Sequence, residues 1–196
     1  MTAMTTQTLP PAPAPPPADG PDWLPRPGTY AADPAHCIAE LTSLFCGLPT
    51  LRARMTAASA RLTVTADAAA CRLRLDLDSA SLDAGSLTTG RPFLNRRLRG
   101  PRGLDAERHT ELTFAGDRIE PSDDGRRITV DGELVLRGVA VPATLRAGVV
   151  ERAPDRLLVL GRAVVTYPKV RRATGFTLPP TAPARILRLL VAVEFS

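Results

Sequence analysis

The sequence predicts an all-β fold of about eight antiparallel strands with one helical excursion, preceded by a disordered Pro-rich arm. Three observations support this. Most of the chain alternates apolar and polar residues with a period of two. The joins between alternating runs are short and rich in Pro, Gly and Asp. Only one stretch has the boundaries of a helix. Alternation alone does not separate a closed barrel from a sandwich, because both bury one face of each strand.

The first segment of the chain is rich in proline and alanine. Nine of the 20 prolines precede Tyr30, and such a tract forms solvated, polyproline-like chain that cannot pack. We expect a disordered arm over residues 1–27 and one β-domain over residues 28–196. The arm lacks the basic and apolar regions of a secretory signal, and no apolar run is long enough to span a membrane. A cytoplasmic protein without a transmembrane segment is therefore predicted.

The strands of the domain follow one another as alternating runs. Residues 61–66 alternate, and after a turn at residues 68–70 the run Cys71–Asp78 alternates without a miss. The stretch from Gly132 predicts a strand, a tight turn at Gly138 and a second strand. Three later sets of residues each share a face: Ile128, Val130, Leu134 and Leu136; Val141, Ala143, Leu145, Ala147 and Val149; and Leu187, Leu189, Val191, Val193 and Phe195.

The one predicted helix lies between Gly90 and Leu104. Pro92 stands near its start, and the pair Gly100-Pro101 bounds its end. A charged connection then ends in a turn and leads into the strand that contains Phe114. These features place a helical excursion inside the β-domain.

The combined order and spacing of these motifs resemble the YceI family of lipocalin-like, isoprenoid-binding proteins. The resemblance runs from about Gly28 to the C-terminus. The segments that carry it are Asp33-Pro34-Ala35-His36 in the opening strand; Leu98, Leu104-Asp105-Ala106, His109 and Phe114 in the central signature; Gly132, Leu134, Leu136, Gly138-Val139 and Pro142 in the later hairpin; and Thr174-Gly175-Phe176. Cys37 replaces the family's Ser in the opening motif.

The resemblance implies a lipocalin-like barrel whose apolar lumen holds a long isoprenoid or fatty chain, without a cofactor or catalysis. Burial of such a chain gains roughly 0.8 kcal/mol per CH₂ group. The resemblance also implies pairing of two copies as a homodimer. The residues assigned to ligand binding are Val64, Leu73, Leu75, Leu77, Phe93, Leu98, Phe114, Leu134, Leu136, Leu189, Val191 and Val193, with His36 and Arg97 as candidates for a head group. The inward aliphatic residues fit a filled core equally well.

Other functional classes find little support in the sequence. The two histidines, His36 and His109, have no Cys or carboxylate at metal-ligand spacing, so we predict no metal site. His36 lies in an alternating run and His109 in a charged loop. No nucleophile elbow or Gly-rich phosphate loop is present, which argues against an enzyme. The net charge of +5 comes from scattered arginines without an aromatic platform, which argues against nucleic-acid binding.

The three cysteines indicate no disulfide framework. Their number is odd and no CxxC spacing occurs. We expect Cys37 and Cys71 to be small buried hydrophobes, and we do not expect a bridge between Cys37 and Cys46.

A protein-interaction module is the alternative to a lipid carrier. The Pro-rich arm and an arginine-rich face at the helix would then contact a partner protein. The same face could meet an anionic membrane surface or a phosphate head, or could simply be solvated. It consists of Arg91, Arg96, Arg97, Arg99 and Arg102.

Overall fold

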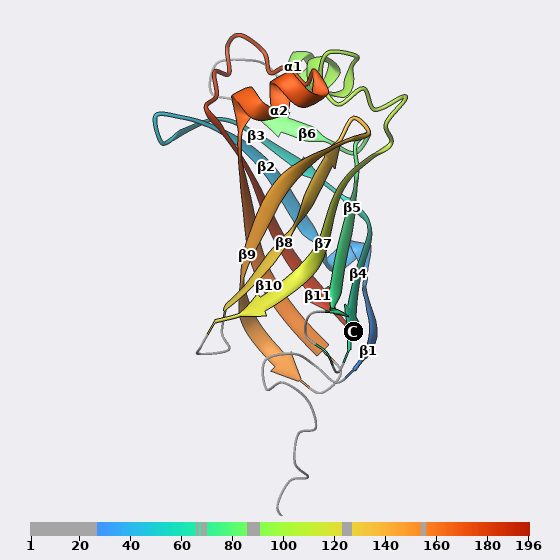
Figure 1. Cartoon of the computed structure of the whole chain (residues 1–196). Coiled ribbons are helices and arrows are strands. Elements are labelled where there is room, and N and C mark those ends of the chain that lie inside the picture. The colour runs from blue at the N-terminus through green and yellow to red at the C-terminus, as the bar shows by residue number, and fades with distance from the viewer. Residues whose placement is uncertain (1–26, 66, 68–69, 86–90, 123–126, 154–155) are drawn as a thin grey trace, which may run out of the picture.

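The computed structural model describes residues 27–65, 67, 70–85, 91–122, 127–153 and 156–196. The predicted arm therefore lies, except for Pro27, outside the described residues, and its disorder stays a prediction. Eleven strands form one antiparallel sheet (Figure 1). They are β1 (Gly28–Ala32), β2 (Ile38–Phe45), β3 (Leu48–Met55), β4 (Ala57–Val64), β5 (Arg72–Asp78), β6 (Asp83–Gly85), β7 (Glu111–Pro121), β8 (Arg127–Leu136), β9 (Val139–Ala153), β10 (Arg156–Thr166) and β11 (Ile186–Phe195).

The sheet closes into the predicted eight-stranded barrel. The first six strands are three longer strands, each interrupted once: β1 with β2, β3 with β4, and β5 with β6. Counted in this way, eight strands surround the barrel axis. The ring is completed where Ala32 pairs with Phe195 and where Ala31 and Ser196 exchange two backbone hydrogen bonds of 3.1 and 3.0 Å.

Alternation places the apolar face of each strand inside the barrel. In β5, Leu75 and Leu77 are buried, whereas Arg72 and Arg74 face outward and are exposed. The tight turn predicted at Gly138 is confirmed, since β8 ends at Leu136 and β9 begins at Val139. The two turn residues, Arg137 and Gly138, have φ angles of 56° and 72°, as a two-residue hairpin with a type I′ turn requires.

The helical content differs from the prediction. Helix α1 (Arg91–Arg99) lies within the predicted range, but a second helix, α2 (Tyr167–Thr174), was not predicted. The expectation of a single helical segment is therefore wrong. A short 3₁₀ helix, η1 (Pro34–His36), also interrupts the strand in which His36 was placed. Its N-cap is Asp33, whose side chain accepts a hydrogen bond of 2.9 Å from the Ala35 amide.

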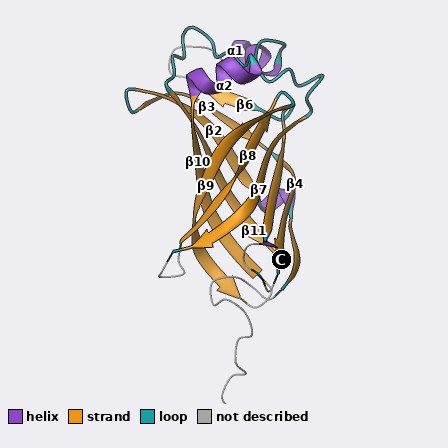
Figure 2. Cartoon of the chain, in the orientation of Figure 1, coloured by secondary structure: helices purple, strands orange, loops and turns teal. Residues whose placement is uncertain are grey.

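Both α-helices cover the same end of the barrel, and the C-terminus lies at the other end (Figures 1 and 2). We call α1, α2 and residues 100–110 and 175–185 the helical cap. Among the described residues, no helix is long and apolar enough to cross a bilayer. The buried apolar residues of the cap are Leu94, Leu98, Leu104, Ala106, Val170, Phe176, Leu178 and Ala182.

The β2–β3 hairpin projects sideways near the capped end (Figure 1). Its turn is formed by Cys46 and Gly47, with φ angles of 51° and 81°. Phe45 and Leu48 beside the turn are exposed. All three cysteines are free, with Cys37 and Cys71 buried as expected and Cys46 exposed.

Candidate functional site

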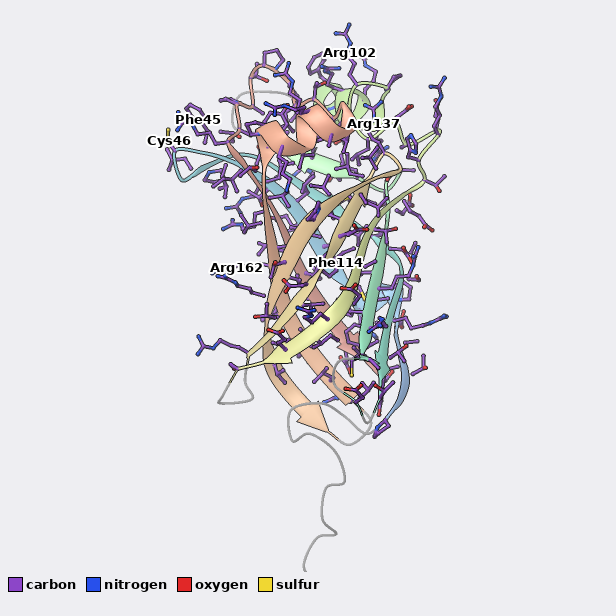
Figure 3. The ribbon with its side chains drawn as sticks, in the orientation of Figure 1. Phe45, Cys46, Arg102, Phe114, Arg137 and Arg162 are labelled. Carbon is purple, nitrogen blue, oxygen red and sulfur yellow. The ribbon has the colours of Figure 1, made fainter. Side chains whose placement is uncertain are left out.

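An enclosed apolar cavity lies inside the barrel, on the side of the interior away from the cap. Phe114, near the middle of the barrel, forms part of its wall (Figure 3). All the lining side chains are apolar, so the cavity offers a ligand no hydrogen-bonding group. The lining residues that the sequence assigned to ligand binding are Leu73, Leu75, Phe114, Leu189, Val191 and Val193. Inward alternation on β5, β7 and β11 brings these six side chains together.

The cavity is small in this conformation. Its volume is about 20 Å³, whereas a cavity that holds benzene has roughly 150 Å³. The barrel is therefore neither hollow nor completely filled, because side chains occupy its interior except for one small gap. A long apolar chain enters only if several lining side chains move. Leu73, which is only partly buried, belongs to this wall.

The remaining assigned apolar residues lie outside the cavity wall. Val64, Leu77, Leu98, Leu134 and Leu136 are buried in the core. Phe93 lies on α1 with 50% of its surface exposed, so it faces solvent rather than the lumen.

Three residues of the cavity wall were not in the assigned set. Leu145 and Phe195 belong to alternating runs that the sequence did reveal, so the same signal could have included them. Val159 lies in the run Leu157-Leu-Val-Leu160, which is apolar at every position. Periodicity does not say which face of such a run is inside. The structure settles the choice, since Val159 is buried and Leu160 is 55% exposed.

The two head-group candidates do not come together. His36 is exposed on η1, with its Nδ1 atom 3.5 Å from Asp33 Oδ2. Arg97 lies on α1 in the helical cap, where its Nη2 atom donates a hydrogen bond of 3.3 Å to Thr177 Oγ1. Neither residue lines the cavity.

The arginine-rich face is divided by its contacts. Arg91 lies 3.7 Å from the Asp83 carboxylate, and Arg99 donates two hydrogen bonds to the Leu82 carbonyl oxygen. Arg97 and Arg102 instead line an open cleft on the outside of the cap, which we call the cap cleft. The remaining member, Arg96, lies in the last turn of α1.

One buried carboxylate lies on the outer wall. Asp76 on β5 accepts hydrogen bonds from Thr113, Ser59 and Arg74 at 2.7, 2.8 and 2.9 Å. Burial raises the pKa of Asp76, but the hydrogen bonds from Arg74, Thr113 and Ser59 and the Arg74 charge outweigh it, so the net pKa is below its usual value. The network is satisfied on every side and has a structural role.

The buried thiol of Cys37 has a raised pKa, in contrast to the lowered pKa of Asp76. Burial, and to a smaller extent the charge of Asp33, raises the pKa of Cys37. This thiol therefore stays protonated and behaves as a small apolar side chain. No cluster of three or more His, Cys, Asp or Glu residues suited to a metal ion occurs in the described parts of the chain.

Comparison with known proteins agrees with this architecture. The family model described as a YceI-like domain matches residues 30–187. No curated protein matches the chain.

Solved structures share the fold at low sequence identity. BcnA of Burkholderia cenocepacia has 17% identity and a TM-score of 0.57, covering 83% of this chain and 98% of its own. A polyisoprenoid binding domain from Saccharophagus degradans, implicated in plant cell wall breakdown, has 13% identity and a TM-score of 0.56, covering 85% and 97%. The Campylobacter jejuni YCEI protein has 15% identity and a TM-score of 0.55, covering 69% and 78%.

Proposed function

The chain belongs to the YceI-like family, and on that premise we propose that it binds an isoprenoid or similar long-chain lipid in its barrel without catalysing a reaction. The observation that carries the proposal is the enclosed cavity lined only by apolar side chains. Such a site favours a hydrocarbon chain, because a buried polar group would find no partner there.

Binding requires the barrel interior to open. Each CH₂ group of a ligand removed from water contributes roughly 0.8 kcal/mol, so a chain of many carbons offsets the cost of moving several side chains. The gap among Leu145, Val191 and their neighbours is where the chain begins to enter. Gly161 does not line the gap but lies directly behind two residues of its wall, because a Cβ atom there would lie 3.1 Å from both Leu145 Cδ1 and Val191 Cγ2.

Native mass spectrometry of gently purified protein, followed by organic extraction, tests the proposal. We expect an added mass that organic solvent releases as a lipid, and uptake of a polyprenol by the emptied protein. A clean mass of the chain alone, together with no uptake of polyprenol or quinone, would contradict the proposal.

A pair of valine variants locates the binding. Val191 lines the cavity and is 5% exposed, whereas Val164 on β10 faces outward and is 49% exposed. Val191→Phe should reduce polyprenol uptake by about ten-fold or more, since the larger ring fills the gap. Val164→Phe, with the same change of volume on the outer wall, should leave uptake unchanged. If Val191→Phe does not fold, Val191→Ile adds a single methylene group at the same position of the cavity wall.

Three further features of this proposal stay predictions. They are the pairing of two copies, a cytoplasmic location, and the division into an arm over residues 1–27 and a domain over residues 28–196. Sedimentation velocity tests the pairing, and fractionation of cells tests the location. Limited proteolysis tests the division, with cleavage expected before Gly28 and a resistant remainder.

A further inference from the structure

The cap cleft gathers positive charge without a matching acid. It has a volume of about 670 Å³ and lies among α1, α2, the β8–β9 turn and the segment that follows α2. No Asp or Glu is among the residues that line it. Figure 3 shows two of its arginines, Arg102 and Arg137, at the capped end of the molecule. Its lining includes four arginines and one tyrosine, namely Arg97, Arg102, Arg137, Arg171 and Tyr167.

Three of the four arginines have no carboxylate partner among the residues that the structure describes. Arg97 donates only to the Thr177 hydroxyl, which in turn donates to the Arg102 carbonyl oxygen at 2.8 Å. The guanidinium groups of Arg102 and Arg171 make no hydrogen bond or ion pair with any described residue. Free guanidinium groups on one cleft repel each other unless an anion lies between them.

Arg137 has a different role from the other three. Its Nη1 atom donates to the carbonyl oxygens of Gly103 and Gly175 at 3.1 and 3.5 Å, and its Nη2 atom lies 4.0 Å from Asp105 Oδ2. Its side chain is only 19% exposed. Arg137 therefore joins two segments, residues 100–110 and 175–185, that both contribute lining residues to the cleft.

The partial negative charges at the C-terminal ends of two helices neutralise part of the arginine charge. The last turns of α1 and α2 contain basic residues, as helix C-termini favour, and each end carries about half a negative charge. Four guanidinium charges, reduced by the Asp105 carboxylate and by two such half charges, leave a surplus of about two positive charges. Arg96, Arg99 and Arg172 also lie in these last turns, so the helix ends do not depend on the cleft arginines.

We propose that the cap cleft is a binding site for a phosphate monoester or diphosphate group. A phosphate monoester carries about −1.5 to −2 charges at neutral pH, which matches the surplus, and a diphosphate carries more. Guanidinium forks bind phosphate oxygens through paired hydrogen bonds. Tyr167 adds a donor, because its oxygen accepts the Leu178 amide at 2.9 Å and its own proton has no acceptor among the described residues.

The phosphate site is independent of the apolar cavity. The two share no lining residue. The buried cap residues Leu98 and Phe176 belong to the core that lies between them. The proposal therefore does not rest on the lipid-binding function, and either one can fail alone.

The phosphate can come from a free molecule or from a lipid head group. The projecting β2–β3 hairpin, with Phe45 and Leu48 exposed, lies at the same end as Arg102 and Arg137 (Figure 3). An apolar tip at the same end of the molecule as a phosphate site is suited to a membrane surface. Both sources present the same group to the cleft, and binding measurements separate them.

Two probes and matched double variants test the site. Isothermal titration calorimetry measures the binding of inorganic pyrophosphate to the protein. Flotation measures its binding to phosphatidylcholine vesicles with and without phosphatidic acid. Arg102→Gln with Arg171→Gln should weaken binding by about ten-fold or more. Arg146→Gln with Arg162→Gln is the matched control. It removes the same charge from two exposed positions that face each other across β9 and β10 on the outer wall, and it should leave binding within about two-fold. Arg102→Lys with Arg171→Lys keeps the charge without the fork and should give an intermediate loss.

Each outcome has a defined meaning. Pyrophosphate binding that depends on the cleft pair supports the site with a free phosphate as its ligand. Binding only to vesicles that contain phosphatidic acid, with the same dependence, supports the site with a head group as its ligand. No binding of either probe, or equal loss in both glutamine pairs, overturns the proposal. Thermal unfolding of every variant verifies the fold, and unchanged polyprenol uptake by the cleft variants separates this site from the cavity.

Discussion

The two halves of the barrel interior are packed in different ways. Under the cap, large side chains such as Leu98, Leu104 and Phe176 are almost completely buried and fill the space. In the other half, a small apolar gap remains among side chains such as Leu145, Val159 and Val191. The difference indicates that the capped half holds the barrel together, while the other half can take up an apolar ligand.

Removal of an aromatic side chain from the cap gives the largest expected effect. Phe176 is 1% exposed and meets Tyr167 edge to face, with ring centroids 6.4 Å apart. Phe176→Ala should lower the free energy of unfolding by about 3–5 kcal/mol, because it leaves a cavity in a filled region. Urea unfolding measures the loss. Phe93→Ala, on the exposed face of α1, is the control and should change stability by less than about 0.5 kcal/mol.

A truncation beside the existing gap should be less costly. Leu189→Ala removes a cavity-lining side chain and should lower stability by about 2–3 kcal/mol. The enlarged gap should also bind a small apolar molecule, so saturating benzene should raise the melting temperature of this variant but not that of the unaltered protein, whose gap is too small for benzene. No stabilisation of Leu189→Ala by benzene would show that this half of the interior does not take up an apolar ligand.

Loss of the Arg137 side-chain contacts should loosen the cap alone. Arg137→Met removes the hydrogen bonds to Gly103 and Gly175, with an expected cost of about 1.5–3 kcal/mol at most. Hydrogen exchange should become faster at cap amides such as Gly175 and Leu104, whose hydrogen bonds close local turns. Amides of β10 and β11 should keep their protection. Faster exchange throughout the barrel would show that the cap is not a separate unit of stability.

The smallest expected effect concerns acid pH and the outer wall. The pKa of Asp76 is lowered in the folded state, so its stabilisation is fully present above the unfolded value, near 3.9, and disappears as the pH falls through the folded value. Asp76→Asn should therefore cost about 1 kcal/mol at neutral pH and nothing below the folded pKa. Unfolding midpoints measured from pH 7 down to pH 2 test this. A cost that persists at the lowest pH would contradict the role of the carboxylate charge.

The strands could be predicted because their apolar residues alternate, as in Leu187–Phe195, where each second residue is buried. Helix α2 escaped prediction because it is short and its buried residues are only Val170 and Thr174. Its signals were Pro168 at the start and Gly175 at the end, the latter with a φ of 72°. The cap cleft could not be predicted at all, since Arg137 and Arg171 lie far apart in the chain and meet only after the barrel forms.

Closure of the barrel through β11 has a consequence for how the protein is made. Strands β1 and β2 leave the ribosome early, yet their neighbour is β11, which comprises residues 186–195. At a synthesis rate of about 5–20 residues per second, the early strands wait on the order of ten seconds for this partner. During that time the apolar inner face of the growing sheet is open to water. We therefore expect the nascent chain to need chaperones that shield such surfaces, since the barrel can close only after translation of β11.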